Sequence, residues 1–221
     1  MRIAPLASVV AVAVAAGSAS AQMRITEWMY DSTTGGYEFI EFTNIGNSPI
    51  DMTGWAFDDN HFGGSDPDPY DLSAFGVVAP GESVILTEGT VAQFRAEWSL
   101  PLAVKVIGLL GDATTGGYNI GRNDSLVLID NFGVVADRLD YGDQTFPGTI
   151  RTRDISGVPM SMAALGANDV TQWRFSVVGD EYFSYASATG NIGSPGYFIP
   201  APASAGVLLV AGLCGMRRRR A

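Results

Sequence analysis

Short apolar runs alternate with turn-forming residues through most of the chain. Strands are predicted where polar and apolar positions alternate or where β-branched and aromatic residues cluster, at residues 24–29, 37–43, 50–57, 83–87, 125–130 and 134–139. Within 37–43, the alternation predicts one face with Phe39, Glu41 and Thr43 and an opposite face with Glu38, Ile40 and Phe42. Many short strands between Gly, Asn and Pro turns predict an all-β fold. An antiparallel β-sandwich is favoured, and a barrel is the alternative.

Turn residues refine this plan. Gly54 breaks the run 50–57, and the turn 131–133 joins the last two predicted strands into a hairpin. The pentapeptide Thr-Thr-Gly-Gly-Tyr occurs at 33–37 and again at 114–118. Two copies do not make a repeat protein, so they predict two similar hairpin turns.

One short helix interrupts the strands. Thr90 is suited to its N-cap, and Val91, Phe94 and Trp98 follow at helical spacing. Pro101 is predicted to end it.

The N-terminus has the features of a secretory signal peptide. Arg2 supplies the positive charge, an apolar stretch follows, and Ala19 and Ala21 frame an A-x-A cleavage site before Gln22. The stretch is shorter than the ~20 residues of a spanning helix, which favours cleavage over an uncleaved anchor. Residues 1–21 are therefore predicted to be a signal peptide that directs the chain to the Sec export machinery.

The C-terminus combines three features in order. The proline motif Pro200-Ala201-Pro202 precedes the apolar run 203–216, and the run precedes Arg217, Arg218, Arg219 and Arg220. The arginines are expected to stay in the cytoplasm, with the body outside. The run predicts a short transmembrane helix, and a plain C-terminal anchor is the alternative.

This ordered trio resembles a PEP-CTERM sorting signal over residues 199–221. One position departs from the family pattern, because Ala201 stands where the family has a central Glu. The resemblance implies transient attachment to the inner membrane of a bacterium that makes exopolysaccharide. It also implies processing by an exosortase and delivery to the cell surface or extracellular matrix.

Charge and cysteine content exclude several function classes. The 221 residues contain 13 Lys and Arg and 23 Asp and Glu. Arg2 and Arg217 to Arg220 are terminal, so the body is strongly acidic and would repel phosphate backbones, and no nucleic acid partner is expected. Cys214 is the single cysteine, which excludes a disulfide scaffold. His61 is the single histidine, and no G-x-S-x-G motif surrounds a serine, so a Ser-His-Asp triad is not expected.

The body also resembles a known module. The stretches that carry the likeness are 25–30, E-F-I-E-F-T-N at 38–44, D-M-T-G-W at 51–55, A-P-G at 79–81, 123–128 and 133–137. In this order they are similar to the lamin-tail domain, over about residues 24–142. The resemblance implies an immunoglobulin-like sandwich and a non-catalytic role. Residues 22–143 are assigned to it, and residues 144–198 to an extension that completes the sandwich or forms an appendage.

Carboxylates give two candidates for chemistry. Glu38 and Glu41 point to opposite faces of one strand, so they are not expected to flank one bond as a glycosidase pair must. The family pattern makes Glu41 structural, with the turn near Asn44 as its expected partner. The best cation candidate is an acidic insert that suits Ca²⁺ in ligand type, with Asp58, Asp59, Asp66, Asp68 and Asp71. A solvated acidic loop is the alternative, and no catalytic, cofactor or metal residue is assigned.

Aromatic residues give one further candidate. Trp55 and Trp98 are predicted to lie in the core. The candidates for a sugar-stacking platform are Trp173, Tyr182, Tyr185 and Tyr197. The sequence thus predicts an exported, non-catalytic module that binds an extracellular polymer or surface protein. A secreted hydrolase and a structural spacer without a specific ligand are the alternatives.

Overall fold

The computed structural model describes residues 22–35, 37–59, 69–110 and 120–198. Short strands dominate them, with one α-helix and three short 3-10 helices in these ranges. The strands are β1 (Met23–Met29), β2 (Phe39–Asn44), β3 (Ile50–Asp51), β4 (Ala56–Asp58), β5 (Tyr70–Asp71), β6 (Val77–Val78), β7 (Ser83–Thr87), β8 (Lys105–Ile107), β9 (Asn123–Ile129), β10 (Val135–Gly142), β11 (Gly157–Pro159), β12 (Trp173–Phe175), β13 (Tyr185–Ala186) and β14 (Ile192–Gly193). The helices are α1 (Val91–Trp98), η1 (Ser73–Phe75), η2 (Met162–Ala164) and η3 (Val170–Gln172).

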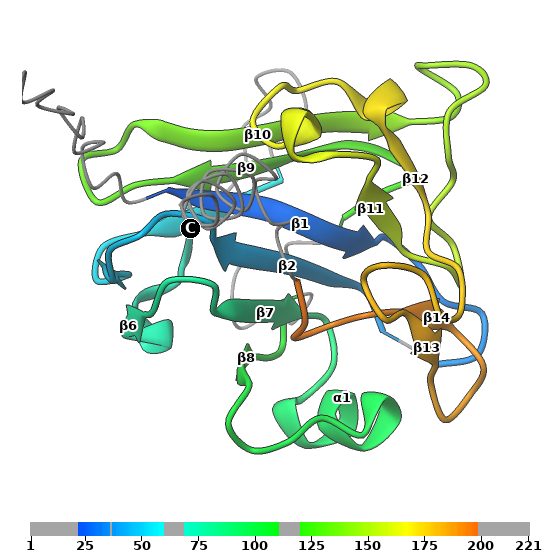
Figure 1. Cartoon of the computed structure of the whole chain (residues 1–221), viewed down its shortest axis with the longest axis horizontal. Coiled ribbons are helices and arrows are strands. Elements are labelled where there is room, and N and C mark those ends of the chain that lie inside the picture. The colour runs from blue at the N-terminus through cyan, green and yellow to red at the C-terminus, as the bar shows by residue number, and fades with distance from the viewer. Residues whose placement is uncertain (1–21, 36, 60–68, 111–119, 199–221) are drawn as a thin grey trace, which may run out of the picture.

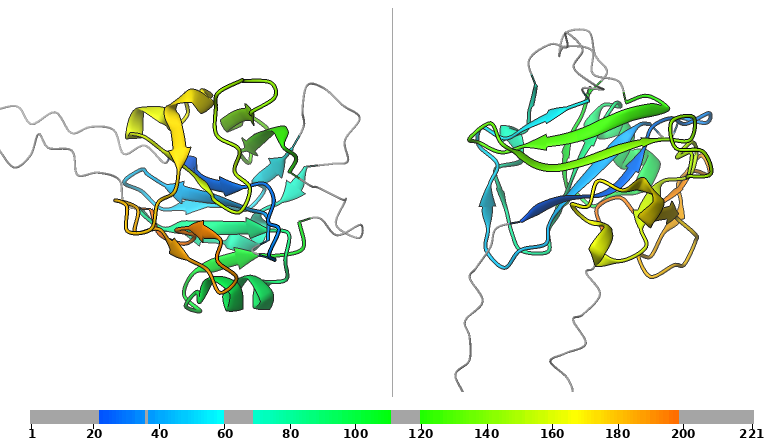
Figure 2. Two further views of the ribbon diagram at one scale, coloured as in Figure 1. Left: turned by 90° about the vertical axis from the view of Figure 1, so that its right-hand side faces the viewer. Right: turned by 90° about the horizontal axis from the view of Figure 1, so that it is seen from above.

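Two sheets form the main layers. A six-stranded sheet has the order β12-β11-β1-β2-β7-β8, and a four-stranded sheet has the order β10-β9-β4-β5 (Figure 1). Buried apolar side chains from both sheets meet between them, among them Trp28, Phe42, Phe57, Leu128 and Tyr141. Seen from above, β9 and β10 lie on one side of β1 and the C-terminal strands on the other (Figure 2). This arrangement is consistent with the predicted immunoglobulin-like all-β fold.

The second face of the six-stranded sheet is covered by α1 and the β13–β14 hairpin. Phe94 and Trp98 of α1 pack on Met29, Phe39 and Ile85 of the sheet. The predicted helix is confirmed: the Thr90 side chain accepts a hydrogen bond from the Gln93 backbone N–H, and Gln93 completes the capping box. The helix ends at Trp98, before the predicted Pro101, because Ser99 adopts a left-handed conformation (φ +52°) as its C-cap.

A β-bulge shapes the middle of β1. The β1–β2 register pairs Ile25 with Phe42 and then Glu27 with Glu41, so Thr26 is the extra residue. The bulge places Thr26 and Glu27 on the same face as Glu41. Glu27 pairs directly with Glu41, and the Thr26 hydroxyl donates a hydrogen bond to Glu41 at 2.6 Å. Two consecutive polar residues of β1 therefore face the same buried region.

Most of the predicted strands are found, with one difference in how they pair. Residues 50–57 divide into β3 and β4 around Gly54 (φ +78°), and β9 and β10 form the predicted hairpin. The sheets are not wholly antiparallel, because β7 and β8 run parallel. A parallel pair needs a crossover connection, and α1 lies in it.

Residues beyond 143 belong to the same body as the rest. β11 pairs with β1, and β12 pairs with β11, so both extend the six-stranded sheet. Of the first pentapeptide, the described residues 33–35 and 37 lie in the β1–β2 connection, and the second, 114–118, lies outside the described residues. No helix in the described ranges is long and apolar enough to cross a membrane. The predicted signal peptide and the apolar run 203–216 lie outside those ranges.

Candidate functional site: an aromatic groove above a buried carboxyl pair

An apolar groove of about 340 Å³ opens beside the C-terminal end of α1. We call it the aromatic groove, and its lining residues are Ser99, Leu100, Pro101, Val104, Phe183, Tyr185, Pro195, Gly196 and Tyr197. Phe183 and Tyr197 are 59% and 47% exposed, and their rings meet edge to face at 5.3 Å between centroids. Exposed aromatic side chains that converge in one hollow are typical of ligand sites.

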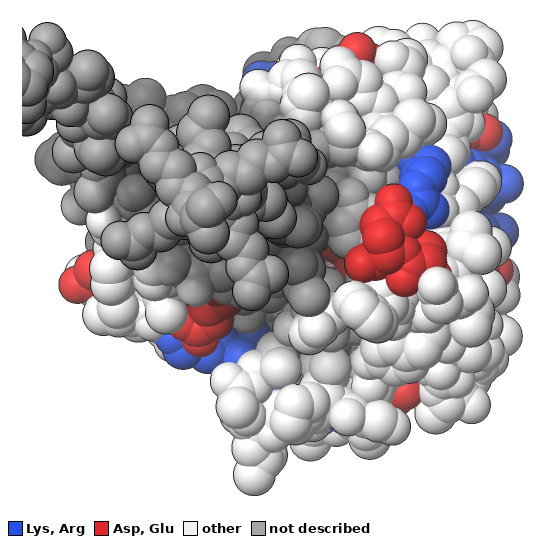
Figure 3. Space-filling model, viewed as in Figure 1, with Lys and Arg blue, Asp and Glu red and all other residues white. Residues whose placement is uncertain are grey.

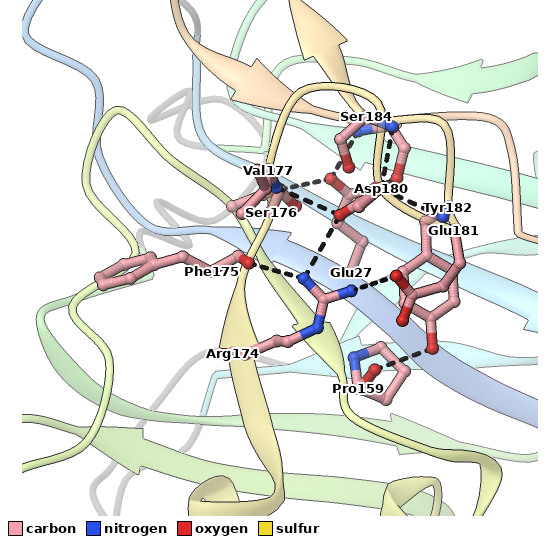
Figure 4. A network of polar contacts seen from close by, with 12 residues as sticks. Glu27, Pro159, Arg174, Phe175, Ser176, Val177, Asp180, Glu181, Tyr182 and Ser184 are labelled. Carbon is pink, nitrogen blue, oxygen red and sulfur yellow. Dashed lines mark hydrogen bonds and ion pairs between the residues drawn. The ribbon is translucent and has the colours of Figure 1, made fainter.

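A tight loop that Asp180 organises presents Phe183. The Asp180 carboxylate accepts hydrogen bonds from the backbone N–H groups of Val177, Tyr182 and Ser184, at 3.0–3.1 Å (Figure 4). These bonds lower the pKa of Asp180 against the opposing effect of burial, which is the larger single influence. Phe183 itself has a left-handed backbone (φ +59°), a strained conformation for an aromatic residue. The loop therefore holds an apolar ring outward at a conformational cost.

Arg174 of β12 fastens the same loop to the sheet. Its guanidinium donates to Glu181 at 2.7 Å and lies 3.5 Å from Asp180 (Figure 4). The Tyr182 hydroxyl donates to the Pro159 carbonyl at 2.8 Å, and the Tyr182 ring stacks on Phe198. The loop that carries Phe183 is thus held by the contacts of Arg174 on one side and of Tyr182 on the other.

The opposite wall is the loop that follows α1. The Arg95 guanidinium donates to the carbonyls of Pro101 and Val104 and so closes this loop. The Tyr185 hydroxyl donates to the Trp98 carbonyl at 2.6 Å, which joins the hairpin to the end of the helix. Both walls are therefore held by hydrogen bonds from side chains.

The floor of the groove is tied to two buried carboxyl groups. The Gly196 N–H donates to Glu41 Oε2 at 2.7 Å, and the Ser194 N–H donates to Glu27 Oε1 at 2.8 Å. Ser194 Oγ donates to Glu27 Oε2 at 2.9 Å. Gly193 must lack a side chain, since a Cβ there would lie 2.7 Å from Glu27 Oε1. The backbone of residues 193–196 therefore packs directly on the two carboxyl groups and is hydrogen-bonded to both.

Glu27 and Glu41, the carboxyl pair, are directly opposite each other on β1 and β2. Both side chains are fully buried. Burial and the nearby charge of Glu41 raise the pKa of Glu27 from 4.5 to about 8. Burial raises the pKa of Glu41 to about 7, against hydrogen bonds from Thr26 and Gly196 that lower it. Burial therefore favours the protonated, neutral form of both carboxyl groups.

Hydroxyl groups surround the pair. Ser156 donates to Glu27, and Ser156 in turn lies 2.7 Å from the Ser176 hydroxyl. On the other side the Thr43 hydroxyl lies 2.8 Å from the Thr26 hydroxyl and 2.7 Å from that of Ser83. No cation of the described residues is bonded to either carboxyl group, and the hydrogen bonds that the two groups accept from these residues come from hydroxyl and backbone N–H donors.

A family model described as Lamin Tail Domain matches residues 16–143, more than half of the chain. The chain belongs to the lamin tail domain family. No match was found among curated proteins. In this lamin tail domain protein the carboxyl pair lies inside the matched part, whereas Ser156, Ser194 and Gly196, which bond to it, lie beyond it. The aromatic groove likewise combines Ser99–Val104 from the matched part with residues 183–197 from the extension.

The structure separates Glu38 from Glu41. Glu38 lines a different hollow of about 380 Å³ at the N-terminal end of α1, with Glu88 and Gln93. Burial and the charge of Glu88 raise the pKa of Glu38 to about 9. The expected bond between Glu41 and the turn near Asn44 is wrong. The Asn44 amide itself holds that turn, by donating to the Ser48 carbonyl at 2.8 Å.

The aromatic candidates divide by burial. Trp98 lies in the core as predicted, but Trp55 is only half-buried at the rim of the core, so its assignment to the core is wrong. Trp173 and Tyr182 are buried and offer no platform, because Trp173 packs on Trp28 and Tyr182 on Phe198. Tyr185 and Tyr197 do line the aromatic groove.

Of the acidic insert, Asp58 and Asp59 are described and half-buried at the end of β4 and just after it. The remaining candidates, apart from Asp71, lie outside the described residues. These are Ala19, Ala21, His61, Asp66, Asp68, Pro200, Ala201, Pro202, Arg217, Arg218, Arg219 and Arg220. Asp71 is exposed and its carboxylate accepts from the Ser73 N–H at 2.9 Å, a turn contact. No group of three or more His, Cys, Asp or Glu side chains within the described ranges could hold a metal ion. Calcium binding by the acidic insert stays a prediction.

Sequence reasoning missed two residues of the site. Glu27 was predicted only as part of a strand, and its partner Glu41 was compared with Glu38. Glu27 comes opposite Glu41 only through a register that includes a β-bulge, and no residue of the sequence marks that bulge. Phe183 follows Tyr182 in an irregular segment, and nothing in the local pattern indicates its exposure.

Proposed function

We propose that this lamin tail domain protein is an exported, non-catalytic binding module whose aromatic groove holds an extracellular polysaccharide. One observation carries the proposal: Phe183 and Tyr197 are exposed, touch each other and are held in place by bonded loops. Rigid aromatic rings offer apolar faces to the C–H faces of sugar rings at little entropic cost. Charged side chains are sparse on the face shown in Figure 3, which favours a ligand that is recognised by shape and stacking.

The ends of the chain support the export part of the proposal. In this view residues 1–21 direct the chain to the Sec machinery and are removed after Ala21. The tail 199–221 then holds the chain at the inner membrane until an exosortase cuts near Pro200-Ala201-Pro202. The body is thereby delivered to the cell surface or extracellular matrix, where a polysaccharide is available.

A secreted hydrolase is the weaker alternative. Glu27 and Glu41 are the two carboxyl groups that converge. Both are fully buried beneath residues 193–196, so the glycosidic bond of a polysaccharide substrate cannot reach them. A spacer without a ligand is also weaker, because a spacer has no need of a strained, exposed Phe183.

Co-sedimentation with the exopolysaccharide of the host tests the proposal. The full chain is expected to pellet with the polymer, and the double substitution Phe183→Ala and Tyr197→Ala is expected to weaken binding at least about tenfold, the loss of about 1.4 kcal/mol. Phe132→Ala is the matched control, because Phe132 is an 84% exposed aromatic that does not line the groove.

Equal binding by the double variant and the parent would show that the groove is not the site. If the chain no longer pellets after the polymer fraction has been treated with protease, the ligand is a surface protein and not the polysaccharide.

A further inference from the structure

We propose that Glu27 and Glu41 are the positioning residues of the aromatic groove and that the groove loosens when both of them carry a charge. This inference names the regulation of the site and rests on the proposed function for its biological meaning. Its physical content, the link between the carboxyl pair and residues 194–197, is independent of any ligand.

The link is short and direct. Gly196 lines the groove, and its N–H bonds to Glu41. Ser194 bonds to Glu27 through both its N–H and its hydroxyl, and Pro195 between them lines the groove as well. Tyr197, the exposed ring, follows at once, with its N–H bonded to the Ser194 carbonyl at 3.1 Å. A shift of residues 194–196 therefore moves the ring that contacts the ligand.

Two adjacent buried carboxylates repel each other, and no cation among the described residues bonds to either. With one proton on the pair, the backbone and hydroxyl donors suffice for the remaining charge. With no proton, both charges must be solvated by the same few donors in a buried site. Water then has to enter, and the path that admits it is displacement of residues 194–196, since β1 and β2 are fixed by their ladder.

The other ionisable groups that face the pair do not titrate in the same range. Tyr185 of β13 has a pKa raised to about 12, by burial and by the charge of Glu27, so it stays neutral. Glu97 of α1 and Asp180 have lowered pKa values and stay charged, and so does Arg174. A change between pH 6 and pH 9 in residues 194–197 therefore reports on Glu27 and Glu41.

Hydrogen–deuterium exchange on the full chain, read by mass spectrometry in peptides that cover residues 190–198, is the decisive measurement. After correction for the intrinsic effect of pH on exchange, the protection of this segment is expected to fall by up to about tenfold per pH unit as pH rises from 7 to about 8, the folded pKa of Glu27, and to level off above it. In Glu27→Gln, which keeps an acceptor for the Ser194 N–H but removes one charge, protection is expected to stay within about twofold over that range.

Glu38→Gln is the matched control. Glu38 also has a raised pKa, about 9, but it lines the hollow at the other end of α1. This variant is expected to change with pH as the parent does in residues 190–198. Protection that does not change with pH in the parent, or that changes equally in Glu27→Gln, would overturn the inference.

Polysaccharide binding separates this inference from the proposed function. If exchange responds to pH as expected and the polymer does not bind, the positioning role stands and the function fails. If the polymer binds with the same affinity at pH 6 and pH 9 while exchange is constant, the function stands and the positioning role fails.

Discussion

The two faces of the six-stranded sheet bury different kinds of side chain. The face toward β9 and β10 is apolar, with Trp28, Ile40 and Phe42 packed against Leu126 and Leu128. The other face is divided: Phe39 and Ile85 pack under α1, whereas Glu27 and Glu41 are buried beside them with a ring of hydroxyl groups. The same strands therefore contribute an apolar core on one side, which we call the dry face. On the other side, which we call the polar face, they contribute a hydrogen-bonded polar cluster.

This difference assigns stability to the dry face and the support of the groove to the polar cluster. Apolar contacts are non-directional, so the dry face needs only residues of suitable size. The polar cluster needs each donor in place, and its donors at 156, 194 and 196 come from the extension beyond the family match. The dry face thus specifies the fold, and the polar cluster attaches the groove to it.

The largest expected effect concerns the centre of the dry face. Trp28 is fully buried and its ring meets those of Tyr141 and Trp173 at 5.4 and 5.0 Å. Trp28→Ala removes these contacts and leaves a cavity, so the free energy of unfolding is expected to fall by about 3–5 kcal/mol. Chemical denaturation at pH 6 measures it. A loss below about 1 kcal/mol would mean that the dry face is not the main source of stability.

The next effect is that of pH on the polar face. Glu27 and Glu41 have pKa values of about 8 and 7 in the folded chain and near 4.5 when unfolded. Between these values the folded chain binds more protons, so stability is full below about pH 4.5 and is lost as pH rises through 7 to 8. We expect the free energy of unfolding to fall steadily as pH rises from 5 to about 8, measured by denaturation at each pH.

The double substitution Glu27→Gln and Glu41→Gln is the control for that loss. It should reduce the slope and leave the part due to Glu38, whose pKa is about 9. The acid limb should stay unchanged, because carboxylates such as Asp140 and Asp180 have lowered pKa values that the double variant does not affect. An identical slope in parent and double variant would contradict the assignment.

The two faces also differ in how far the sequence predicts them. Alternation over 37–43 placed Ile40 and Phe42 opposite Phe39, and the structure has this arrangement. It could not place Thr26 and Glu27 on one face, because a bulge breaks the period of two without a residue such as glycine to mark it. The bonds from Ser194 and Gly196 span 167 and 155 positions along the chain, and no local pattern encodes contacts of that range.

Trp55 gives the smallest expected effect and tests the edge of the dry face. The D-M-T-G-W motif predicts a core tryptophan, but the structure leaves Trp55 half-buried, where it packs on the core and also lines a surface hollow of about 560 Å³ with Phe132. Only the buried part of a side chain contributes transfer free energy, at roughly 25 cal/mol per Å². Trp55→Ala is therefore expected to cost about 1–2 kcal/mol, less than half of the loss for Trp28→Ala, in the same denaturation experiment. Equal losses at the two positions would mean that the domain closes over Trp55 in solution and that the dry face extends to its edge.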